Sequence, residues 1–312
     1  MISRRQFTQA FAATVATASL AGCSSAPASV PVAAGTGAGK NTTLGPVKQI
    51  DAGLLNIGCA EAGPADGPVA ILVHGWPYDI HSYVDVAPAL AASGYRVIVP
   101  YLRGYGTTTF LSKDTFRNGQ QAAVASDIIA ALSPERCKAA VLVSGYLITS
   151  LEANLKPLPP AAELGWWYQY YFSTERGVLG YTENRHDFNK LIWKIVSPKW
   201  NFDDATYERT ATSFTNPDHV SVVIHNYRWR LSLAKGEPQY DELEKKLAGA
   251  PVITVPTITI GSDFDGAAAD GAAYRAKFSG RYEHRIFRGI GHNVPQEAPR
   301  DFVTAVVDAD HL

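Results

Sequence analysis

Short apolar runs alternate with longer amphipathic stretches through much of the chain. Three runs rich in β-branched or aliphatic residues lie at positions 69–73, 95–99 and 137–148. Continuous apolar runs of this length are typical of strands that are buried on both faces of a parallel sheet. Stretches with helical spacing separate them, "APALAASG" before the second run and "QAAVASDIIAAL" before the third. The alternation predicts βαβ units, and therefore an α/β fold with a mostly parallel sheet flanked by helices.

The pattern changes between residues 151 and 235. Aromatic residues become dense there, as in "GWWYQYYF" and "HNYRWRL", helical spacing dominates, and no strand-like run occurs. Strand and loop patterns return near the end of the chain with "VPTITIGSDFDG" and "YEHRIFRGIGHNVPQEAP". We therefore expect a core in two parts, residues 46–150 and 236–312, with residues 151–235 inserted as a helical cap.

The first 23 residues have the pattern of an export signal. Arg4 and Arg5 match a twin-arginine signal, and the weakly apolar run that follows is too short to span a bilayer. The run ends in Leu-Ala-Gly-Cys23, which is similar to a bacterial lipobox; the alternative is an ordinary cleaved signal in which Cys23 has no role. Residues 24–45 are mostly small or polar, which predicts a flexible tether. We expect an exported, periplasmic lipoprotein, anchored to the membrane through Cys23.

Composition narrows the classes of function. The formal net charge is −1, with 46% hydrophobic and 18% charged residues, so nucleic acid is not an expected partner. No metal-ligand spacing such as HExxH or CxxC occurs, and we expect no metal and no cofactor. Cys59 and Cys137 lie in apolar, strand-like contexts, so we expect buried free thiols rather than a disulfide. Nothing in the sequence indicates an oligomeric state.

Four short motifs follow predicted strands in a fixed order. They are His74-Gly75-Trp76-Pro77, Arg103-Gly104-Tyr105-Gly106, Asp263-Phe264-Asp265-Gly266 and Gly291-His292-Asn293. Their order and spacing resemble the α/β-hydrolase superfamily, specifically its epoxide-hydrolase and haloalkane-dehalogenase-like branch. The resemblance extends from about residue 47 to residue 312, and it implies the α/β-hydrolase fold with an inserted helical cap.

The resemblance also implies a role for each motif. In the family the first loop, here His74 to Pro77, supplies a backbone N–H to an oxyanion hole. Trp76 would donate that amide, Gly75 permits the tight turn, and we expect a cis Trp76-Pro77 bond. His292 would act as general base, oriented by an acid in the loop that follows "TITIG". Asp265, the second acid of the Asp-x-Asp-Gly pattern, is the preferred partner, and Asp263 is the alternative.

The insertion resembles the cap of this branch, in which two tyrosine hydroxyls hold and protonate the epoxide oxygen. Tyr170 or Tyr171 in "WWYQYYF" and Tyr227 in "HNYRWR" are the candidates. An aromatic stripe at helical spacing also serves as the packing core of a cap, which is the alternative interpretation of these residues. Asp79 and Arg103 are interpreted as structural.

The segment that should carry the nucleophile is missing from the sequence. The fold places its nucleophile on a sharp strand–turn–helix elbow, with small residues two positions before and after it. Such a unit takes about 30 residues, yet "QAAVASDIIAAL" runs directly into "SPERCKAAVLVSGY" with no elbow pattern between them. Ser144 is a weak substitute, because Leu142 and Tyr146 are too large for an elbow. Asp127 is weaker still, because it lies in the middle of a predicted helix.

Two classes of function therefore remain open from the sequence. The first is an epoxide-hydrolase-like hydrolase that acts on a small apolar substrate under the cap. The second is a relative with impaired or no catalysis that keeps the site and binds a ligand or partner. An internal deletion in the gene would produce the same pattern. With base, acid and oxyanion donors but no nucleophile, we expect slow or undetectable turnover and a marginally stable fold.

Overall fold

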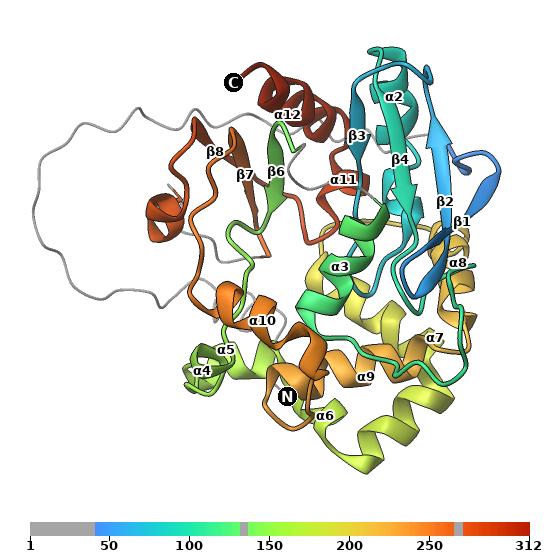
Figure 1. Cartoon of the computed structure of the whole chain (residues 1–312), viewed down its shortest axis with the longest axis vertical. Coiled ribbons are helices and arrows are strands. Elements are labelled where there is room, and N and C mark those ends of the chain that lie inside the picture. Colours follow the sequence, from blue (N-terminus) through green and yellow to red (C-terminus); the bar gives the residue numbers. More distant parts are fainter. Residues whose placement is uncertain (1–40, 132–136, 265–270) are drawn as a thin grey trace, which may run out of the picture.

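The computed structural model describes residues 41–131, 137–264 and 271–312, which form two sheets with helices around them (Figure 1). The first sheet has the order β1-β2-β4-β3, with β5 beside β2: β1 (Val47–Ala52), β2 (Leu55–Ala62), β3 (Val69–Ile71), β4 (Arg96–Pro100) and β5 (Thr109–Phe110). The second has the order β6-β7-β8: β6 (Ala140–Val143), β7 (Thr257–Ser262) and β8 (Tyr282–Phe287). The α/β fold expected from the sequence is confirmed.

The strands around the expected site are parallel. β3 runs parallel to β4, and β6, β7 and β8 are parallel to one another, while β1 and β2 pair antiparallel at the outer edge of the first sheet. β7 lies between two neighbours, and all six of its residues are buried. Because the loops after parallel strands meet at one edge of a sheet, this arrangement brings together the segments that follow β3, β7 and β8.

The two sheets are not hydrogen-bonded to each other within the described residues, and the interruption falls between β3 and β6. On β3 and just beyond it, Val69, Ile71 and Val73 are 52%, 37% and 41% exposed, whereas Ala70 and Leu72 between them are buried. The residues of β6 are all half-buried. An apolar strand with one face exposed is unusual for the interior of a parallel sheet. Within the described residues no strand lies between β3 and β6, as the missing elbow predicts.

Helices cover the sheets and form the cap (Figure 1). Those of the core are α2 (Val86–Ala92), α3 (Gln121–Ala131), α10 (Asp241–Ala248), α11 (Val294–Glu297) and α12 (Pro299–His311). The predicted cap contains α4 (Leu151–Asn154), α5 (Pro160–Gly165), α6 (Trp167–Ser173), α7 (Glu175–Val196), α8 (Asp204–Ala211) and α9 (His219–Arg230), and no strand. Short 3₁₀ helices are η1 (Ile80–Tyr83), η3 (Thr212–Thr215), η4 (Pro238–Tyr240) and η5 (Ala272–Lys277).

Packing joins the two sheets where hydrogen bonds do not. Helix α12 contacts α2 beside the first sheet and also β6 and β7 of the second. One hydrophobic core includes Val97 and Leu90 from the first half together with Ile258, Ile260 and Phe302 from the second. Burial of apolar area is the main source of folding free energy, so this shared core holds the halves together across the interruption.

The structure tests whether Cys59 and Cys137 are free and whether they are buried. Cys59 and Cys137 are both free, as predicted, and Cys59 is buried in β2. The expectation that Cys137 is buried is wrong: it is exposed, because it lies before the first residue of β6, outside the sheet.

In the described part of the chain, no helix is long and apolar enough to cross a membrane.

Candidate active site

The loop after β3 forms a tight turn at the carboxyl edge of the first sheet. The Trp76-Pro77 peptide bond is cis, as predicted. Tyr78 N–H donates to Gly75 O over 2.9 Å, which closes the turn, and Gly75 is exposed with no atom within 4 Å of the place a Cβ would occupy. Across residues 41–131, 137–264 and 271–312, no acceptor is assigned to Trp76 N–H. The turn therefore presents a free amide donor beside open space, which is what an oxyanion hole requires.

His74 supports this turn from beneath. It is buried, and its Nε2 accepts the Leu102 N–H over 3.2 Å, so Nδ1 carries the proton and points at Gly75 O, 3.3 Å away. Burial lowers the pKa of His74 to about 4, so the imidazole is neutral at pH 7. His74 thus joins the loop after β3 to the loop after β4 and does not face the open side of the turn.

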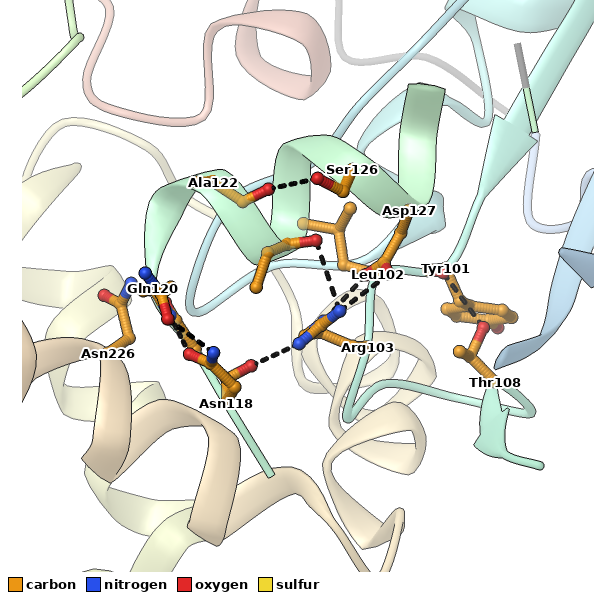
Figure 2. A network of polar contacts seen from close by, with 12 residues as sticks. Tyr101, Leu102, Arg103, Thr108, Asn118, Gln120, Ala122, Ser126, Asp127 and Asn226 are labelled. Atoms are coloured by element: carbon orange, nitrogen blue, oxygen red, sulfur yellow. Dashed lines mark hydrogen bonds and ion pairs between the residues drawn. The ribbon is translucent and has the colours of Figure 1, made fainter. Parts of the chain in front are cut away.

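A buried ion pair fixes the loop after β4 to helix α3 (Figure 2). Arg103 Nε and Nη2 donate to the two carboxylate oxygens of Asp127, each over 2.7 Å, and Nη1 donates to Asn118 O over 2.6 Å. Both side chains are almost fully buried. A bidentate pair of this kind holds a geometry strongly, and removing one partner leaves an uncompensated buried charge. Arg103 and Asp127 are therefore structural, and Asp127 is not available as a nucleophile.

Cap aromatic residues pack against Trp76. Tyr168 of α6 and Tyr227 of α9 lie 5.1 and 5.3 Å from its ring, and both are buried. Tyr181 of α7 accepts a hydrogen bond from Trp76 Nε1 over 2.9 Å. Burial raises the pKa of Tyr168 and of Tyr227 above the ordinary value of 10.0, so both hydroxyls stay protonated at neutral pH.

The candidate tyrosines of the sequence occupy different places. Tyr227 faces Trp76 directly. Tyr170 is 44% exposed and its hydroxyl donates to Glu163, away from the turn, while Tyr171 stacks on Phe188. Tyr168, which sequence reasoning did not single out, takes the position next to Trp76. Phe172, four residues further on, shares its helix face and is buried, but the sequence alone does not mark that face as the buried one.

His292 lies on the loop after β8 and is half-buried. Its ring lies 4.5 Å from Phe264 and 5.8 Å from Tyr78, two residues beyond the cis peptide bond. Phe264 in turn contacts Trp166, at the start of α6, with ring centroids 6.2 Å apart. The histidine therefore lies in a wall of aromatic side chains that runs from the loop after β3 to the cap.

The acid loop after β7 is joined to the histidine loop by the backbone. Asp263 N–H donates to Ile290 O over 2.9 Å, and the Asp263 carboxylate accepts from Gly289 N–H and from Lys199. Asp263 is thus engaged with a surface lysine. Asp265 lies outside the described residues, as does Cys23, so the choice of Asp265 as the acid stays a prediction.

Ser144 follows β6, the strand nearest to the vacated position. Its φ is 65°, in the left-handed region, and its N–H donates to Ile260 O of β7 over 2.8 Å. Helix α4 begins seven residues later at Leu151, so no helix follows at once and no elbow forms. A positive φ at a residue other than glycine is strained, and such strain occurs in ordinary turns as well as in functional loops.

Comparisons with known proteins agree with this fold. A family model for the alpha/beta hydrolase fold matches residues 68–133. A Klebsiella pneumoniae protein of known structure, named as a candidate epoxide hydrolase, is 55% identical, with a TM-score of 0.82 over 85% of this chain and 97% of its own.

Two curated relatives match over shorter stretches. A haloalkane dehalogenase from Mycobacterium marinum is 50% identical over 46 residues, 15% of this chain, and epoxide hydrolase A from Mycobacterium tuberculosis is 42% identical over 57 residues, 18% of this chain. These stretches span only 16% and 18% of the relatives' own lengths. Family membership rests instead on the Klebsiella protein, which is matched over nearly its whole chain. This chain belongs to the α/β hydrolases, in the branch that resembles epoxide hydrolases.

Proposed function

We propose that the protein hydrolyses small apolar epoxides in the space between the cap and the two loops at the carboxyl edge of the sheets. The observation that carries the proposal is the surroundings of Trp76: its backbone N–H has no assigned acceptor within the described residues, and its ring packs against two buried, protonated cap tyrosines, Tyr168 and Tyr227. Donors fixed in a low-dielectric site stabilise an oxygen on which negative charge develops. The aromatic wall favours an apolar substrate.

The proposed reaction uses a water molecule as nucleophile. A water oxygen attacks one epoxide carbon while its proton passes to the imidazole of His292. The ring C–O bond breaks, and the oxygen that leaves takes a proton from Tyr168 or Tyr227, which gives a diol. The alkoxide is more basic than a tyrosinate, so this transfer stays favourable although burial raises the pKa of both phenols. The imidazolium then returns its proton through solvent to the tyrosinate.

The rate should be low, because no elbow nucleophile is present. Water lacks the proximity advantage of a fixed side chain. We expect turnover roughly 10³-fold or more below that of an enzyme with a complete nucleophile, base and acid. The comparisons give no support to the alternative of a purely binding protein.

The route of the oxygen tests the proposal. Purified protein in excess over a terminal epoxide in ¹⁸O-labelled water should give a labelled diol in the first turnover. An unlabelled first product would reveal a covalent ester with a carboxylate, and therefore a nucleophile in this chain. Diol formation no faster than in buffer, across epoxides, haloalkanes and simple esters, would sink the proposed activity.

For localisation we propose a periplasmic lipoprotein held on the membrane through Cys23. Arg4 and Arg5 and the Leu-Ala-Gly-Cys sequence support it, and these residues lie outside the described ones. Replacing Cys23 with Ala should move the protein from the membrane fraction to the soluble periplasmic fraction. A wild-type protein that is already fully soluble would contradict the lipid anchor.

A further inference from the structure

The two loops of the candidate site belong to different half-sheets. The turn that holds Trp76 follows β3 in the first sheet, and the loop that holds His292 follows β8 in the second. In the described residues no strand pairing connects these sheets. A hydrogen-bonded sheet would fix the separation of the two loops, so another part of the molecule must set it here.

The long cap helix α7 contacts the first loop through two side chains. Trp193 Nε1 donates to Pro77 O over 2.8 Å, and Tyr181 accepts from Trp76 Nε1 over 2.9 Å. Both Trp193 and Tyr181 are fully buried. Trp76 and Pro77 are therefore both held to α7, through side chains that lie about three helical turns apart.

The residue that ends α7 contacts the second loop. Ser197, the C-cap of α7, is buried and accepts the backbone N–H of His292 over 3.0 Å. Its hydroxyl donates to Glu297 over 2.7 Å. The packing is tight, because a Cβ on Gly291 would lie within 2.4 Å of the serine oxygen.

Glu297 completes this attachment from α11. Its carboxylate accepts the N–H of Gly291 over 2.7 Å and of Asn293 over 3.1 Å, the residues on either side of His292. The side chain is 7% exposed and makes no ion pair within the described residues. A buried carboxylate needs such donors to remain in place. Three consecutive amides, those of residues 291–293, are thus bound by one Ser–Glu pair.

We infer that the end of helix α7, through Trp193 and Ser197 with Glu297, positions His292 relative to the oxyanion turn in place of a continuous sheet. Trp193 and Ser197 are one helical turn apart, so they lie on the same face and reach the two loops together. The Tyr78 ring contacts both Trp193 and His292, with centroid distances of 5.0 and 5.8 Å. The base role of His292 rests on the proposed function; the attachment itself does not.

The Ser197→Ala variant tests the attachment without a large loss of volume. The matched control is Ser213→Ala: Ser213 is also buried and donates over 2.8 Å, but to Thr210 O within the cap. We expect the His292 amide to exchange with solvent about tenfold faster in Ser197→Ala, since one hydrogen bond of ordinary strength is lost. Ser213→Ala should leave that amide unchanged. Equal exchange at His292 in the wild type and in Ser197→Ala would overturn the inference.

Kinetics separate positioning from general stability. In Ser197→Ala we expect kcat to fall about tenfold while KM stays within about twofold, because only alignment of the base is altered. Trp193→Phe should lower kcat similarly and speed exchange at the Tyr78 amide, which closes the turn. Unchanged kcat in both variants would contradict the inference. If the wild type shows no turnover, the proposed function fails, but the exchange measurement still decides the attachment.

Discussion

Strands β3 and β7 have similar sequences and different surroundings. Both are short and rich in β-branched residues; the sequence predicts a buried parallel strand at residues 69–73 and a strand followed by a loop in "VPTITIGSDFDG". β7 has a partner on both sides and is wholly buried, whereas in the part of the chain that the structure describes β3 pairs only with β4 and leaves Val69 and Ile71 exposed. The comparison teaches that burial of a parallel strand is a property of its neighbours, and that one absent neighbour alters the sheet on both sides of the interruption.

The same division separates the chemistry. The half-sheet that ends in β3 carries the turn whose Trp76 N–H we propose as the oxyanion donor. The half-sheet around β7 carries His292 and the acidic loop that would move a proton. The absent unit between them is the one that should supply a nucleophile. Pairs of substitutions, one in each half, can therefore test whether the two halves have these separate roles.

The largest expected effect is that of His292→Ala on turnover. Loss of the general base should lower kcat/KM about 10²–10⁴-fold, the usual contribution of such a group. The matched substitution in the other half is His74→Gln, which keeps an acceptor for Leu102 N–H and should cost far less activity. Steady-state rates of diol formation measure both. Similar losses in the two variants would contradict the assignment of the proton-moving role to the β8 loop.

Stability should respond unequally to truncation in the two strands. Ile260 of β7 is fully buried, so Ile260→Ala should lower the free energy of unfolding by about 2–5 kcal/mol. Ile71 of β3 is exposed, so Ile71→Ala should cost less than about 1 kcal/mol. Urea denaturation of both variants beside the wild type measures the difference. A large cost at Ile71 would mean that its side chain is covered in solution.

The protein should lose stability in mild acid. Because the pKa of His74 is about 4 when folded and about 6.5 when unfolded, the unfolded state binds the proton first as pH falls. This contribution to the free energy of unfolding is fully present above pH 6.5 and is lost as pH falls; the loss reaches roughly 3 kcal/mol near pH 4. Denaturation midpoints at pH 7.5, 6 and 4.5 should fall in that order, and the fall should be smaller in His74→Gln. An equal fall in the two proteins would contradict the cause given.

Substitution of the two acids in the loop after β7 should change kcat by less than His292→Ala does, and the two acids should differ in their effect. Asp265→Asn should lower kcat about a hundredfold if Asp265 orients His292. Asp263→Asn should have little effect, because the Asp263 carboxylate is held by Lys199 and by Gly289 N–H at the surface. Rates for the two variants decide between the alternatives that the sequence left open, and the reverse order would assign the role to Asp263.

Much of the fold follows from local sequence signals. The cis bond at Trp76-Pro77, the helical cap and the vacated strand position are all visible in short motifs and in their spacing. Each depends on residues close together in the chain, or on a unit of known length being absent. The exposed position of Cys137 was missed because the limits of a strand depend on pairing, which composition does not fix.

Local sequence signals could not identify which cap tyrosine lies beside Trp76. The segment "WWYQYYF" is aromatic at every position except Gln169, and one polar residue does not mark which face of α6 is buried. Packing of Tyr168 and Phe172 against Trp76 sets the rotation of the helix and selects Tyr168 over Tyr170. Ser197 and Glu297 meet across 100 residues of sequence, and only the folded chain brings them together.

Amide hydrogen exchange along β3 tests the vacated strand position most directly. Leu72 N–H donates to Ile98 O of β4, so the N–H groups of Val69 and Ile71 point away from β4, and they have no acceptor within the described residues. We predict fast exchange at Val69 and Ile71, beside strong protection at Ile258 and Ile260 of β7, which lies between two strands. Equal protection at Ile71 and Ile260 would show that a strand occupies the edge of β3 in solution, and would contradict the account.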